Sequence, residues 1–152
     1  MTDERLVSSH PDPDNPGWLI WEVADPTRFN RAVLGKLLAR REGERSARLR
    51  MFPERHHSNL LDNVHGGITM SLADICLFAT TQLVTGADTI GAVTIEMSTH
   101  FLGAGRVGVP LDAVGEVLRE TRRLVFLRGV VEQEGELTAS FSATIRKMSA
   151  PK

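Results

Sequence analysis

The stretch that most limits the possible folds is a nearly uninterrupted apolar segment, Gly66 to Val84, with one carboxylate, Asp74, in its middle. Its side chains leave almost no polar face, so the segment predicts a helix that other elements cover on nearly all sides. Gly86 is placed to end that helix. Because burying an unpaired charge is costly, Asp74 needs either a structural partner or a chemical role.

The segments around this helix predict strands. Residues 36–52 predict two strands joined at the sequence REGE, and WLIWEV (18–23) predicts a short strand or a plug. After the helix the hydrophobic period changes to two: Val93, Ile95, Met97, Thr99 and Phe101 alternate with polar residues. Three more strands follow, with hairpin turns at RETRR and EQEGE. The chain therefore predicts an α+β fold, an antiparallel sheet wrapped around one long central helix.

The N-terminal part predicts little regular structure. Residues 1–17 are polar and rich in Pro and Asp, and we expect a flexible arm there, ahead of a single domain over residues 18–152. The sequence DPTRFNRAVLG predicts a helix that Asp25 caps and Gly35 ends.

Composition excludes several classes of function. The net charge of −1 argues against nucleic acid as the main partner. No signal peptide is evident, and no run approaches the roughly 18 apolar residues of a membrane span, so we expect no membrane partner. One cysteine permits no internal disulfide, and a cytoplasmic protein is the expectation.

Three local patterns have plain structural interpretations. The sequence GAGRVG (103–108) matches a dinucleotide motif, but a strand-like segment follows where that motif requires a helix, so we predict a turn. The spacing of His56, His57, Asp62 and His65 fits no standard metal site, and we expect no metal. Cys76 lies on a different helix face from Asp74 and is interpreted as a core residue.

The start of the long helix offers a chemical partner for Asp74. His65-Gly66-Gly67 stands there; glycines allow close approach of a ligand, and the first helical turn has free N–H groups that suit a developing oxyanion. Gly66 and Asp74 are eight residues apart, roughly 12 Å along a helix. Both can therefore act on one small group only if the second comes from another subunit, which predicts a site shared across a two-fold axis.

These residues resemble a known family. NLLDNVHGGITMSLAD is similar to the signature of hotdog-fold acyl-CoA thioesterases of the PaaI-like group, relatives of 4-hydroxybenzoyl-CoA thioesterase. The family's asparagine, His-Gly-Gly and aspartate correspond here to Asn59, His65-Gly66-Gly67 and Asp74, with every interval kept. The resemblance runs from about residue 29 to residue 148. One departure is Asp62, where the family often has glycine.

The resemblance implies hydrolysis of an acyl-CoA, or of an acyl-carrier protein, to free acid and thiol. The Gly66 N–H would polarise the thioester carbonyl with help from Asn59, and Asp74 of the other subunit would act as base or nucleophile. His65 would orient the substrate, and Thr94 would position water. The residues expected to bind substrate are Gly67, Phe78, Phe101, Arg106, Arg122 and Arg123, the three arginines near the CoA phosphates. The family implies no metal, no cofactor, and a homodimer or a dimer-of-dimers tetramer.

Two other functions remain open at this point. One is a hotdog module that binds acyl-CoA without hydrolysing it, and the other is an enoyl-CoA hydratase or dehydratase on the same fold. A fold alone does not decide between them, because function depends on the site. Asp74 could also be paired for structural reasons only, and the sequence does not name the acyl group.

Overall fold

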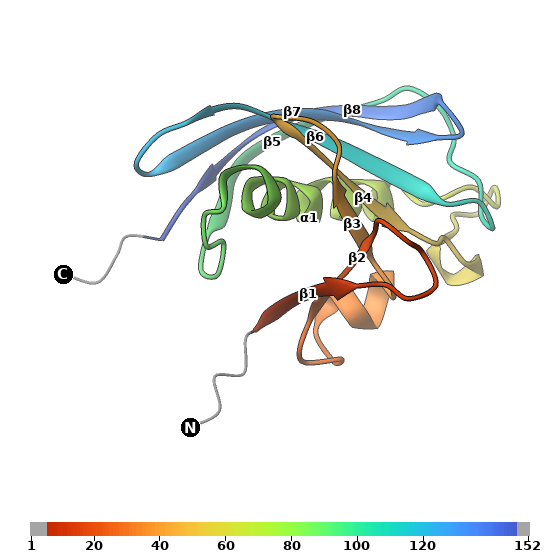
Figure 1. Ribbon diagram of the computed structural model, residues 1–152. Helices are drawn as coiled ribbons and strands as arrows, with labels where there is room; N and C mark the ends of the chain where they lie inside the picture. The colour runs from red at the N-terminus through yellow and green to blue at the C-terminus, as the bar shows by residue number, and fades with distance from the viewer. Residues whose placement is uncertain (1–5, 149–152) are drawn as a thin grey trace.

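The computed structural model describes residues 6–148 and shows one eight-stranded antiparallel sheet that arches over a single long helix, α1 (Gly66–Thr85) (Figure 1). The strand order is β1-β2-β3-β4-β6-β7-β8-β5. This confirms the α+β hotdog fold, with an antiparallel sheet wrapped around a central helix. The strands are β1 (Val7–Pro11), β2 (Leu19–Val23), β3 (Leu38–Arg41), β4 (Ser46–Met51), β5 (Val93–Phe101), β6 (Leu111–Glu120), β7 (Leu124–Gln133) and β8 (Glu136–Arg146).

Helix α1 ends where the sequence predicts. Gly86 has φ 72°, a left-handed conformation that glycine adopts without strain, and its N–H donates to the Gln82 carbonyl. By length and composition α1 could also cross a membrane, which the count of apolar residues above missed. In this fold the apolar side chains of α1 are instead covered by the sheet, and half of the apolar stretch is buried inside the protein.

The helix packs directly on β6. A Cβ atom at Gly115 would lie 2.5 Å from Thr80 Oγ1 and 3.2 Å from Cys76 Sγ, so only glycine permits this approach. Cys76 is fully buried, and burial raises the pKa of its thiol to about 11. A thiol that holds its proton so tightly is a poor nucleophile, which confirms the core role of Cys76.

The prediction of a loose arm over residues 1–17 is wrong where the structure describes it. Strand β1 pairs along its length with β2, and Asp12, in the turn between them, forms an ion pair with Lys36 at 2.8 Å. Residues 1–5 lie outside the described residues. The sequence SSHP lacks apolar alternation because β1 is an edge strand and mostly exposed.

The helix predicted from Asp25 to Gly35 is reduced to a short helical turn, η1 (Asn30–Leu34). The Asp25 carboxylate accepts hydrogen bonds from the N–H and the hydroxyl of Thr27, two residues on. Such a local bond closes a turn instead of capping a helix. Gly35 does end the helical turn, with φ 73°.

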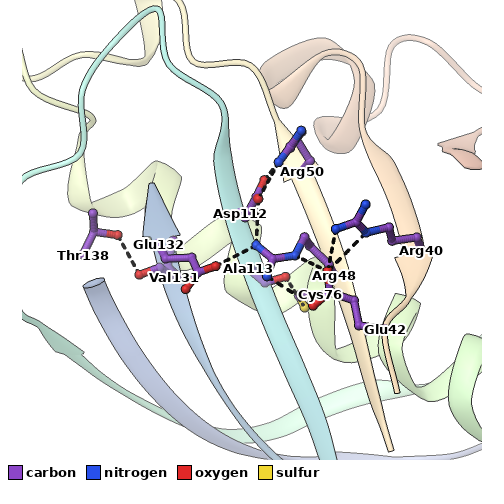
Figure 2. Close-up of polar contacts among 10 residues, drawn as sticks. All are labelled: Arg40, Glu42, Arg48, Arg50, Cys76, Asp112, Ala113, Val131, Glu132 and Thr138. Carbon is purple, nitrogen blue, oxygen red and sulfur yellow. Dashed lines mark hydrogen bonds and ion pairs between the residues drawn. The ribbon is translucent and has the colours of Figure 1, made fainter. Parts of the chain in front are cut away.

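The outer face of the sheet carries a network of ion pairs (Figure 2). Asp112 on β6 accepts from both Arg48 and Arg50 on β4, and Arg48 also bonds Glu132. Trp18 lies beneath this network, 4.6 Å from the Arg50 guanidinium. The network fixes β4, β6 and β7 against one another on the side of the sheet away from α1.

Candidate active site

The first turn of α1 leaves one backbone donor without a partner among the described residues. His65 caps the helix: its Nδ1 accepts from the Gly67 N–H at 2.9 Å, and its carbonyl accepts from the Ile68 N–H at 2.9 Å. The Gly66 N–H therefore remains available at the positive end of the helix dipole. Since Nδ1 is an acceptor, the neutral imidazole carries its proton on Nε2, which has no protein partner in this range.

The loop before α1 is held by Asn59. Its Oδ1 accepts from the N–H groups of Leu61, at 2.9 Å, and Asn63, at 3.2 Å. The Nδ2 group of Asn59 donates to no partner among residues 6–148, so both of its N–H bonds remain available. Asp62, at the position where the resemblance would lead one to expect glycine, has φ 59° and so adopts the left-handed conformation. Aspartate tolerates this conformation better than most residues.

Asp74 has a partner in β5. The Thr94 hydroxyl donates to Asp74 Oδ1 at 2.6 Å, and Asp74 is half-buried. Thr94 faces the helix because β5 contains a bulge: Thr94 lies opposite Ile145 and Glu96 lies opposite Thr144, which leaves Ile95 without a cross-strand partner. Strict alternation would place Val93 and Ile95 on the same face as Met97, but with the bulge both side chains are exposed.

Within one chain the two halves of the proposed site stay apart. Gly66 lies against Phe101, whose ring would be 3.3 Å from a Cβ at Gly66, whereas Asp74 lies against Thr94 at the other end of β5. The eight-residue spacing on a regular helix keeps Gly66 and Asp74 roughly 12 Å apart. No single chain can present both groups to one carbonyl carbon.

The residues expected to bind substrate fall into three places. Gly67 and Phe101 lie at the start of α1, with Phe101 half-exposed. Phe78 is half-buried one turn after Asp74, on the same helix face. Arg106 is engaged by Glu134 at 2.7 Å. Arg122 and Arg123 occupy the exposed turn between β6 and β7, at the opposite end of the sheet from Arg106.

The structure adds a feature that sequence reasoning missed. A hollow of about 720 Å³ lies beside the Asn59 loop. Leu60 is 102% exposed and Leu61 is 80% exposed, the two most exposed large apolar side chains among residues 6–148. Their only sequence signal is an apolar pair in an otherwise polar turn. The hollow is lined by Arg55, Ser58, Asn59, Leu60, Leu61, Asp62 and His65.

The donors at the helix start do not resemble a metal site. Both nitrogens of the buried His57 are engaged, Nε2 with the Val33 carbonyl and Nδ1 with the Glu54 N–H. No group of three or more His, Cys, Asp or Glu side chains suited to a metal occurs in the described part of the chain. The arrangement supplies hydrogen-bond donors to a carbonyl oxygen and, on another part of the helix, a carboxylate held by a hydroxyl.

Solved structures share this fold. Thioesterase superfamily member 2 of zebra fish is 25% identical, with a TM-score of 0.70 over 82% of this chain and 90% of that one. The PaaI protein from the phenylacetic acid degradation operon of E. coli is 19% identical, with a TM-score of 0.67 over 82% and 87%. A mutant form of the phenylacetic acid degradation protein PaaI of Thermus thermophilus is 23% identical, with a TM-score of 0.67 over 82% and 100%. The two PaaI likenesses show the fold alone.

Sequence comparison leads to the same family. A search among curated proteins gives no match. The family model described as "Thioesterase superfamily" matches residues 61–140, more than half of the 152 residues. The matched range contains the helix start, Asp74 and the strands β5, β6 and β7. The chain belongs to the thioesterase superfamily.

Proposed function

We propose that this protein is an acyl-CoA thioesterase in which Asp74 of one subunit and Gly66 of the partner subunit act on the same thioester. The observation that carries the proposal is that the chain has both a half-buried carboxylate, held by Thr94, and a helix start at which the Gly66 N–H has no partner among the described residues. A thioester carbonyl is already electrophilic, so one oxyanion donor and one base suffice.

A two-fold axis can bring the two halves together. On α1 the positions left uncovered by the sheet form one stripe: Gly67, Met70, Ser71, Asp74 and Phe78. Strand β5 lies at the edge of the sheet, with no neighbour on its second side among residues 6–148. Both uncovered surfaces therefore belong to the side of the molecule that carries Asp74.

The register of such a dimer follows from the contacts of β5. An antiparallel copy, related by an axis at Ser98, places Thr94 opposite Phe101 of the partner subunit, because the bulged Ile95 takes no place in the register. Because Asp74 lies at Thr94 and Gly66 lies at Phe101, the same rotation carries Asp74 toward Gly66 of the partner subunit. On the helices the axis falls at Met70, midway between Gly66 and Asp74.

In this arrangement the chemistry is hydrolysis. The thioester oxygen accepts hydrogen bonds from the Gly66 N–H and the Asn59 side-chain amide, which stabilise the negative charge that develops there. Asp74 either takes a proton from water as the water attacks the carbonyl carbon or attacks that carbon itself. Collapse of the intermediate breaks the carbon–sulfur bond, and the thiolate takes up a proton and leaves as the thiol. When water is the attacking group, the free acid forms in this step; when Asp74 attacks, water then hydrolyses the mixed anhydride on Asp74 to release the acid. Arg122 and Arg123 are the proposed contacts of the CoA phosphates.

The test is thiol release from a panel of acyl-CoAs by the wild type, Asp74→Asn and the control Asp88→Asn, whose carboxylate lies in an exposed turn. We expect at least one acyl class to be hydrolysed, with Asp74→Asn at least about a hundredfold slower and Asp88→Asn unchanged. Binding of acyl-CoA without hydrolysis by the wild type would instead identify a non-catalytic binding module.

The two-fold is tested by cross-linking. Met70→Cys is expected to form a disulfide-linked dimer under mild oxidation, because position 70 meets its own copy at the axis. Ser142→Cys, on the exposed outer face of β8, is the control and should remain unlinked. The native Cys76 does not interfere, since it is fully buried.

A further inference from the structure

Four arginines at one end of the sheet have no acidic or carbonyl partner among residues 6–148: Arg119, Arg122, Arg123 and Arg146. The nearest acid in sequence, Glu120, is engaged by Lys147 at 2.6 Å. Each of the other arginines in this range either donates a hydrogen bond to a carboxylate or backbone carbonyl or forms an ion pair with a carboxylate. Like charges gathered without counter-charges repel one another, so this end of the molecule is set up for an anionic partner.

Two of these arginines, Arg119 and Arg146, lie on strands next to an exposed aromatic ring on the outer face of the sheet. Arg119 on β6 lies opposite Phe126 on β7. Side chains alternate along a strand, and the neighbours Val125 and Ile145 are buried toward α1, so Phe126 and Arg146 point outward. Phe126 is 36% exposed. We call Phe126 and the four arginines the arginine surface.

Arg119, Phe126 and Arg146 lie on the other side of the sheet from the candidate active site, but close to it, whereas Arg122 and Arg123 lie in the turn at the end of the sheet. Arg146 is opposite Val93, and the preceding residue Ile145 is opposite Thr94, which holds Asp74. A molecule bound on the arginine surface would therefore sit one sheet thickness from Asp74, beside the start of β5.

We infer that the arginine surface docks an acidic carrier protein that delivers the acyl thioester on a phosphopantetheine arm. This inference rests on the proposed thioesterase function and names the form of its substrate. Arginine and aromatic side chains together are the composition typical of protein interfaces, where one exposed ring anchors the contact. Acidic side chains on the carrier would supply the missing partners of the arginines and speed the encounter.

Two other occupants fit less well. A second copy related by a two-fold axis would place the same unpaired arginines against one another. A nucleic acid needs a long basic track, but Glu96 and the Glu116–Arg128 ion pair adjoin the arginine surface on the same outer face and limit its extent. A small acidic protein face matches both the charge and the size.

The experiment compares one acyl group carried by CoA and by an acidic acyl-carrier protein. The variant is Arg119→Glu/Arg146→Glu, and the control is Arg28→Glu, which makes one such charge reversal at an exposed site with a loose 3.4 Å contact to Asp25. We expect the double variant to lower kcat/KM for the acyl-carrier protein at least about tenfold, through KM. Hydrolysis of the acyl-CoA should change less than about twofold, and Arg28→Glu should affect neither substrate.

A binding measurement separates this inference from the proposed function. Calorimetry of the unacylated holo-carrier protein at low salt requires no hydrolysis, and both the double variant and Phe126→Ser, which alters no charge, should weaken binding. Loss of carrier binding in these variants together with no thioesterase activity in the wild type would refute the proposed function and keep this inference. Three results in the double variant would overturn the carrier-docking inference. These are an equal decrease of kcat/KM with the CoA and carrier substrates, unchanged binding of the carrier protein, or a changed oligomeric state.

Discussion

The hydrogen bond between Thr94 and Asp74 gives the sharpest test of the proposed site. Thr94→Val keeps the branched shape of the side chain and removes only the hydroxyl that donates to Asp74 Oδ1 at 2.6 Å. A hydrogen bond to a charged group is worth about 1.5–3 kcal/mol net. At about 1.36 kcal/mol per factor of ten in rate, the loss corresponds to a decrease in kcat of about tenfold to about 150-fold.

The same strand supplies a matched control. Thr99 also faces α1 from β5, but its Oγ1 is buried without a hydrogen-bond partner in the described structure. Thr99→Val therefore removes an unsatisfied polar atom, and we expect unchanged kcat and a free energy of unfolding that is equal or up to about 1 kcal/mol higher. Both variants make the same chemical change on the same face of one strand.

The assay is steady-state thiol release with a hydrolysed acyl-CoA, together with urea unfolding of each variant. We expect Thr94→Val to lower kcat with KM within about twofold of wild type, because the lost bond orients the base and does not hold the substrate. Wild-type kcat in Thr94→Val, or an equal decrease in Thr99→Val, would refute the reasoning that Thr94 positions Asp74. If Thr94→Val instead impaired folding, its urea midpoint would fall below those of the wild type and Thr99→Val.

Three further predictions concern the rest of the molecule. Asp112→Ala leaves two arginines of the outer-face network without their shared carboxylate and should lower the free energy of unfolding by about 3 kcal/mol in urea titrations. The Lys36 ammonium holds the pKa of Asp12 at about 2, below its usual 3.8, so this pair stabilises the fold above pH 4 and ceases to do so as pH falls toward 2. Asp12→Asn should remove that part of the acid sensitivity of thermal unfolding. Burial raises the pKa of Cys76 to about 11, so a thiol reagent at pH 8 should modify it only after denaturant is added.

Much of the fold follows from two periodicities. The apolar segment from Gly66 and its glycine stop predict α1 to within one residue at its end, and the change to period two predicts β5 to β8. These elements are long and their patterns are set by burial against one another. The same reasoning fails for β1, where an exposed edge strand has no apolar alternation to reveal it and is formed by pairing with β2.

The candidate site was predictable in composition but not in its connections. The spacing of Asn59, His65 and Asp74 locates the loop and the helix, because these residues are close in sequence. The exposure of Leu60 and Leu61 is a result of how the loop closes, through the bonds that Asn59 Oδ1 accepts, and a single sequence gives no measure of it. Contacts between Asp74 and groups of a second subunit are harder still to predict, because the sequence of one chain does not show how two copies pack.

Thr94 shows why the two kinds of sequence reasoning conflict and how the fold resolves them. The alternating pattern puts Val93 and Ile95 on the inner face of β5, whereas the family resemblance needs Thr94 there, and neighbours on a regular strand cannot face the same side. The bulge at Ile95 turns Thr94 toward the helix and leaves the side chains of Val93 and Ile95 exposed. Bulges of this kind re-aim a side chain at functional sites. Because the bulge is set by pairing with Ile145 in β8, far along the chain, no local pattern around Thr94 could have predicted it.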